Sequence, residues 1–275
     1  MEKLRLLPVC CLIAAMFIAA IHAANCQDDR GPHSSKSIMI YILSDRSDNS
    51  HWYKDPADLN PLREVLEDRG YSVDVEDKLT LPVISINDMR SYQEIWILEG
   101  DWDDKVDVTE KEAFDLRQYY EMGRGIWLSF ETTYPPDDTY GSWNEDALVF
   151  ARKFGIDWAS YEIGKPGGRP VFSDHPIFHG VLLISFDDAT GCLCSKNSSI
   201  EVLWNYSPSC QGVAVLDGRN KGEGRAVFDS GWVLGYTYLN KNDDLLFAGN
   251  VADWLLPSNG GTQDVAGNDP VVLME

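Results

Sequence analysis

Short apolar runs alternate with amphipathic segments through the first half of the chain. Residues 38–45, 93–100 and 125–131 are β-branched or aromatic runs of strand length that end in polar loops, which is typical of buried parallel strands. Residues 71–77 alternate apolar and polar positions, and this pattern predicts an edge-like strand.

Two helices are predicted between these strands. Residues 58–70 place Leu59, Leu62 and Leu66 on one helical face and end at Gly70. Residues 109–123 open with a Thr-x-x-Glu sequence, which is typical of a capping box. Strands and helices that alternate at this spacing predict an α/β fold with a doubly wound, mainly parallel sheet.

The second half of the chain predicts helices at both ends and short strands between them. A helix is expected over residues 144–155, and strands near residues 182–186, 200–206, 212–217 and 225–229. The last helix, over residues 243–256, is expected to bury a stripe made of Leu245, Ala248, Ala252 and Leu255. The Gly-rich residues 165–170 lack the strand-to-helix context of a phosphate loop and are interpreted as a plain loop.

The N-terminus has the layout of a signal peptide. Lys3 and Arg5 precede an apolar run, and small residues follow at Ala23 and Ala24. We therefore expect residues 1–23 to direct export, residues 24–36 to form a polar linker, residues 37–257 to form the folded domain, and residues 258–275 to be a disordered tail. The alternative is an uncleaved N-terminal anchor; lipidation at Cys26 is disfavoured because Asn25 replaces the usual small residue.

Charge narrows the range of partners. The chain carries 44 acidic and 23 basic residues and a formal net charge of -21. Binding to phosphate backbones or anionic membranes needs clustered Lys and Arg, so nucleic acid and membrane surfaces are not expected partners.

Four cysteines remain after the signal segment, at positions 26, 192, 194 and 210. An exported chain favours disulfides, and one of Cys192 and Cys194 paired with Cys210 is the preferred interpretation, although the spacing does not fix the pairing. A zinc site is the less favoured alternative, because the CxC pair has no nearby His.

Four strings resemble the class I glutamine amidotransferase-like superfamily: GRGIWLSFE, HPIFHGV, GEGRAVFDSGW and NKNDDLLFAGNVADWLL. The chain is most similar to the non-catalytic or uncharacterised branch, which includes the domain of intraflagellar transport and gliding-motility ABC-type proteins. This resemblance implies a flavodoxin-like sheet with an antiparallel C-terminal extension.

The catalytic residues of that superfamily are missing from the matching positions. Its catalytic members carry a Cys nucleophile on the tight turn after the third core strand, where this chain has Glu131. The His base would follow a later strand, where this chain has Asp229 followed by Ser-Gly-Trp. Glutamine hydrolysis by the family mechanism is therefore not expected.

Carboxylates and aromatic residues gather where the predicted strands end, which is where open α/β sheets bind ligands. The candidate ligand-binding residues are Asp45, Asp101, Trp102, Glu131, Tyr134, Asp229 and Trp232. No cofactor or metal is assigned, although Ca²⁺ or a sugar would each relieve the crowding of carboxylates.

Three interpretations of this edge stay open. The acidic loops are solvated surface, or they form a small-ligand or glycan site, or Glu99 or Glu131 works with Asp229 as the acid and base of a glycoside-type hydrolase. We expect an exported, non-catalytic binding module, with the hydrolase as the alternative. We further expect the Glu131 carboxylate to accept hydrogen bonds close to Asp229 or Glu99.

Overall fold

The computed structural model describes residues 36–44, 56–99, 108–129, 145–163, 167–171, 173–186, 189–207, 210–230, 239 and 241–256. These residues belong to one compact unit, Ser34–Glu275. The predictions for the signal segment, the linker and the tail lie almost wholly outside them. No helix in the described ranges is both long and apolar enough to cross a bilayer.

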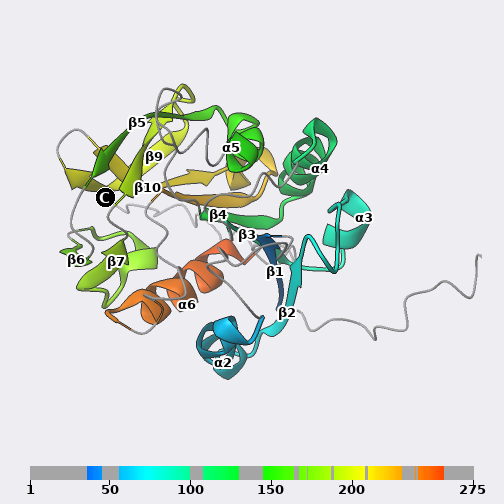
Figure 1. Ribbon diagram of the computed structural model, residues 1–275, viewed down its shortest axis with the longest axis horizontal. Coiled ribbons are helices and arrows are strands. Elements are labelled where there is room, and N and C mark those ends of the chain that lie inside the picture. The colour runs from blue at the N-terminus through cyan, green and yellow to red at the C-terminus, as the bar shows by residue number, and fades with distance from the viewer. Residues whose placement is uncertain are drawn as a thin grey trace, which may run out of the picture. The chain divides into compact units, whose positions relative to one another are not determined.

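A seven-stranded sheet organises the domain (Figure 1), with strand order β2-β1-β3-β4-β11-β10-β9. Its first five strands are parallel, and β10 and β9 continue it in antiparallel orientation. The predicted mainly parallel sheet with an antiparallel C-terminal extension is confirmed. The bounds of its strands are β1 (Ser37–Leu43), β2 (Ser72–Asp77), β3 (Glu94–Glu99), β4 (Gly125–Ser129), β9 (Ile200–Ser207), β10 (Cys210–Asp217) and β11 (Arg225–Asp229).

Two pairs of strands stand apart from the main sheet. They are β5 (Ile156–Ile163) with β8 (Ala189–Ser195), and β6 (Gly167–Pro170) with β7 (Leu183–Phe186), both antiparallel. The interpretation of residues 165–170 as a plain loop is wrong for Gly167–Pro170, because these residues pair with β7. The β5–β8 pair was not predicted from the sequence.

The helices cover both faces of the main sheet (Figure 1). Helices α2 (Asn60–Asp68) and α6 (Asp244–Leu255) cover one face, with the short η1 (Pro56–Leu59) and η2 (Pro176–Phe178). Helices α3 (Ile86–Met89), α4 (Glu110–Glu121) and α5 (Glu145–Arg152) cover the other, and η3 (Arg219–Lys221) lies between β10 and β11. This arrangement is doubly wound, as the sequence predicts.

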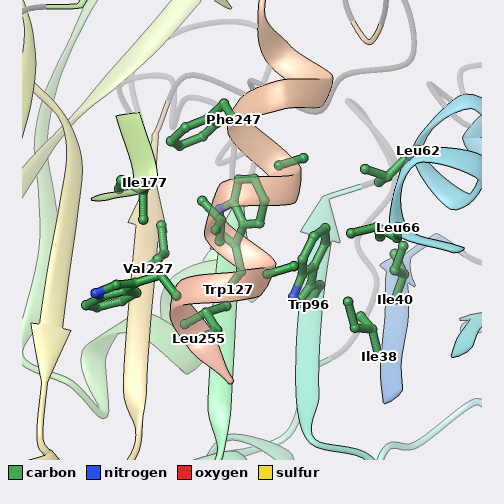
Figure 2. Packing of buried hydrophobic residues seen from close by; sticks show 14 of the residues in the cluster. Ile38, Ile40, Leu62, Leu66, Trp96, Trp127, Ile177, Val227, Phe247 and Leu255 are labelled. Atoms are coloured by element: carbon green, nitrogen blue, oxygen red, sulfur yellow. The ribbon is translucent and has the colours of Figure 1, made fainter. Parts of the chain in front are cut away.

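Successive side chains of each strand point to opposite faces of the sheet, so a hydrophobic core lies on each face. Ile38, Ile40 and Ile42 of β1 point to the α6 face, whereas Met39 and Tyr41 point to the α4 face. On the α6 face, Trp96 meets Trp127 edge-to-face with ring centroids 4.8 Å apart (Figure 2). Buried on both faces, the central strands carry the near-continuous apolar runs seen in the sequence.

Candidate functional site

The carboxyl ends of β4 and β11 bring a serine and an aspartate together. Register pairs Ser129 directly with Asp229, and both side chains are fully buried. The Ser129 hydroxyl donates a hydrogen bond of 2.5 Å to Asp229 Oδ2. Both residues continue the alternation of Trp127 and Val227, so they point to the α6 face. At this edge of the sheet the two polar side chains contact each other and are shielded from solvent.

Glu99 ends the neighbouring strand β3 but points to the other face. It continues the alternation of Ile95 and Ile97, which belong to the α4-side core. It is 5% exposed. Strand β4 separates β3 from β11, a spacing of roughly 10 Å between their backbones. The structure therefore does not bring Glu99 and Asp229 together on one face.

The other predicted ligand-binding residues are Asp45, Asp101, Trp102, Glu131, Tyr134 and Trp232, and all of them lie outside the described residues. The hydrogen bonds predicted for Glu131 remain a prediction. What the structure adds is the position of the strand that leads to it, because Ser129 closes β4 two residues earlier.

Sequence reasoning missed Ser129. A serine at a strand end is unremarkable in the sequence, and its importance depends on β11 pairing with β4 across 100 residues. The available signal was the resemblance itself: a nucleophile and its base must lie within hydrogen-bond reach, and the matching positions in this chain follow these two strands.

A buried ion pair lies at the same edge, on the α4 face. Lys78 Nζ is 2.7 Å from Glu112 Oε1, and the two side chains are 5% and 0% exposed. Glu112 also accepts hydrogen bonds from the backbone N–H groups of Ile84 and Thr109, and its bond to Thr109 completes the predicted capping box of α4. Because each charge has several partners, the pair ties the β2–α3 connection to the start of α4.

At the opposite edge, Glu94 is a fully buried carboxyl group. Its Oε2 accepts a 2.9 Å hydrogen bond from Trp96 Nε1, and its Oε1 has no hydrogen-bond partner. Burial raises the pKa of Glu94 well above its usual range, while the bond from Trp96 opposes the shift. Burial in the α6-side core thus favours the neutral form of Glu94 over the charged one.

The structure also describes the side chains of His175 and Cys194. The His175 ring accepts a hydrogen bond from the Ile177 N–H and packs edge-on against Trp254, and burial lowers the pKa of His175. Cys194 is a half-buried free thiol, so a disulfide through it is not formed. Among the side chains that the structure describes, no group of three or more potential metal ligands occurs.

Comparison with known proteins relates the chain to others through its fold. No protein-family profile matches the sequence, and no curated protein matches it. A cytoplasmic protein, STM3548 from Salmonella typhimurium, is similar in structure with a TM-score of 0.57 at 13% identity, over 81% of this chain and 99% of that one.

Two other solved structures are similar to this chain over most of its length. The mmIFT52 N-terminal domain has a TM-score of 0.54 at 12% identity, over 82% of this chain and 99% of its own. A putative ThuA-like protein from Bacteroides uniformis has a TM-score of 0.52 at 14% identity, over 83% of this chain and 94% of its own. At these identities the likeness concerns the fold alone, a mainly parallel α/β sheet covered by helices on both faces.

Proposed function

We propose that this chain is an exported, non-catalytic amidotransferase-like domain that binds a small ligand or glycan at the carboxyl edge of its sheet. Its sequence resemblance is to the non-catalytic branch that includes the intraflagellar transport and gliding-motility domains, and the likeness to the mmIFT52 domain is compatible with that branch. The observation that carries the proposal is the buried hydrogen bond between Ser129 and Asp229.

That contact occupies the two strand ends from which catalytic members of the superfamily present a nucleophile and its base. A serine is activated when a neighbouring base can take its proton while the oxygen faces a substrate. Here the Ser129 hydroxyl is fully buried and its proton is directed at Asp229. The pair is therefore better suited to a structural role than to a catalytic one.

Binding is assigned to the loops beyond the strand ends, where the sequence carries Trp102, Glu131 and Trp232. Aromatic rings beside carboxylates suit a sugar, since pockets combine apolar walls with a few polar anchors. The location follows the rule that open α/β sheets bind ligands beyond the carboxyl ends of their strands.

The test is a binding screen of the purified chain against neutral mono- and oligosaccharides, read by tryptophan fluorescence and calorimetry. A saccharide that binds should lose about tenfold or more in affinity in Trp102→Ala or Trp232→Ala, following the cost of removing a central aromatic contact. Phe114→Ala is the control, because Phe114 is 53% exposed on α4.

The competing function is a carboxylate-dependent hydrolase. Turnover of a glycoside, ester or amide that disappears in Glu131→Gln or in a folded Asp229→Asn variant would replace binding with catalysis. Failure of every saccharide to bind, with no turnover, would remove the glycan proposal.

A further inference from the structure

Two consecutive aspartates at the start of α6 hold the β6–β7 hairpin. Asp243 Oδ2 accepts hydrogen bonds from the backbone N–H groups of Leu182 and Leu183, at 2.8 and 2.9 Å. Asp244 Oδ1 accepts a 2.7 Å bond from the Ser185 N–H. These carboxylates accept hydrogen bonds from backbone groups of β7 and of Leu182, the residue before it.

The two aspartates differ in burial. Asp243 is partly exposed, whereas Asp244 is fully buried and its Oδ2 has no hydrogen-bond partner. A buried, unpaired carboxylate oxygen is costly when the group is charged and much less so when it is protonated. The hairpin is thus attached in part through Asp244, a carboxyl group that is less costly to bury when it is protonated than when it is charged.

Neutral hydrogen-bond donors and one carboxylate surround Asp244. The charged neighbour on its own helix is Asp243, which repels it. From β7 come the Ser185 N–H and hydroxyl, and the Ser185 hydroxyl accepts a 2.8 Å bond from Asn242 Nδ2. The backbone of Asn242 supplies a further hydrogen bond to Asp244. In the described part of the chain, no Lys, Arg or His side chain forms an ion pair with Asp244.

We propose that Asp244 makes the junction between α6 and the β6–β7 hairpin an acid-tightened latch, which holds the hairpin more firmly in mildly acidic than in neutral solution. This device goes beyond the proposed binding function and does not depend on it. Undocking the hairpin would return Asp244 to water, where it ionises without penalty.

The size and sign of the effect follow from proton linkage. Burial is the largest cause that raises the pKa of Asp244, from 3.8 to about 6, and the charge of Asp243 adds to it, while hydrogen bonds from Ser185 and from the Asn242 backbone oppose it. A carboxyl with a raised pKa stabilises the docked state below its free pKa and loses that contribution as the pH rises through the docked value. Between pH 5 and pH 7.5 the docking equilibrium should weaken about tenfold.

Hydrogen exchange of the full chain tests the latch, with rates corrected for the intrinsic effect of pH. The Leu182, Leu183 and Ser185 amides should be about tenfold better protected at pH 5 than at pH 7.5. In Asp244→Asn, which imitates the protonated acid, protection should no longer depend on pH. Asp253→Asn, at the far end of the same helix, should keep the wild-type difference.

Either of two results overturns the latch. One is equal protection of these amides in the wild-type chain at both pH values, which decides the matter even if Asp244→Asn does not fold. The other is a folded Asp244→Asn chain that keeps the pH difference.

Discussion

The hydroxyl of Ser129 and the carboxylate of Asp229 meet where no water reaches either of them. Ser129→Ala removes the donor and leaves an alkyl group facing a buried carboxylate oxygen. We expect the free energy of unfolding to fall by about 1 to 3 kcal/mol, as for other buried polar groups that lose a partner.

Urea unfolding of the wild-type and variant chains measures this difference. Ser91→Ala is the matched control, because its exposed hydroxyl makes only a 3.4 Å bond to the Asp88 carbonyl, and we expect it to change stability by no more than about 0.5 kcal/mol. Equal effects of the two substitutions would contradict a structural role for Ser129.

The contribution of the buried Lys78–Glu112 ion pair to stability can also be tested by substitution. Glu112→Ala leaves the ammonium group of Lys78 buried without its carboxylate and removes the acceptor for Ile84 and Thr109. We expect a loss of about 3 to 5 kcal/mol in unfolding free energy.

An exposed pair provides the comparison. Glu67→Ala breaks the Arg63–Glu67 contact, in which both side chains are more than 40% exposed, and should cost about 0.5 kcal/mol or less. If calorimetric unfolding gave similar costs for Glu67→Ala and Glu112→Ala, burial would not be the cause.

At the scale of elements, helix α6 is fixed at both ends. Its first turn holds β7 through Asp243 and Asp244. Near its last turn, the Arg225 guanidinium donates to the Trp254 carbonyl and lies over the Trp254 ring, while Arg69 pairs with Asp253 at 2.6 Å. The Arg225 cation thus interacts favourably with the negative end of the helix dipole. Figure 2 shows the helix running along the strands on this face of the sheet.

Close approach of α6 to β4 makes Gly125 a sensitive position. A Cβ atom there would lie 2.7 Å from the Leu255 carbonyl oxygen and 2.9 Å from Leu255 Cβ. Gly125→Ala must push helix away from strand, and we expect it to lower unfolding free energy by about 1 to 3 kcal/mol in urea titrations.

A glycine within α6 should behave differently. At Gly249 the added Cβ would meet the guanidinium of Arg69, the end of a flexible side chain, and alanine favours the helix by about 1 kcal/mol. Gly249→Ala should therefore stay within about 1 kcal/mol of the wild type. A Gly125→Ala chain as stable as Gly249→Ala would show that the helix has room to move.

Elements with a strong local signal were predicted well. The capping box of α4, the Gly70 end of α2 and the apolar runs of β1 and β3 are set by nearby residues, and the structure confirms them. The buried stripe of α6 was only partly correct. Leu245 is half-buried, while Phe247, Val251 and Trp254 are buried, because the sheet, η2 and α2 surround the helix on more than one side.

Elements that depend on distant partners were missed. The strand β6 contains two glycines and a proline, and it exists because β7 pairs with it. The Ser129–Asp229 contact likewise depends on which strands become neighbours. Local pattern carries no information on such pairings, and this is why the sequence predicted the sheet but not its polar contacts.

For the whole molecule, the excess of acidic residues has a thermodynamic cost. A net charge of -21 makes the compact state repel itself, and dissolved salt screens that repulsion. We expect the Tm to rise when sodium chloride is increased from about 10 mM, where the Debye length is about 30 Å, to about 0.1 M, where it is about 10 Å.

Differential scanning calorimetry at neutral pH measures the shift, and potassium chloride at the same ionic strength should reproduce it. An unchanged or falling Tm would mean that attractive ion pairs, such as the one between Arg69 and Asp253, outweigh the general repulsion.

The position of β11 also governs how the chain can fold. Strand β4 ends at Ser129, but its neighbour on one side is made of residues 225–229, which a ribosome adds about 100 residues later. Until then one edge of β4 is unpaired, and an unpaired strand edge can form hydrogen bonds with a non-native strand or with another chain. Closing a contact over so long a loop is slow, so the central sheet is completed late in synthesis, when its last parallel strand arrives.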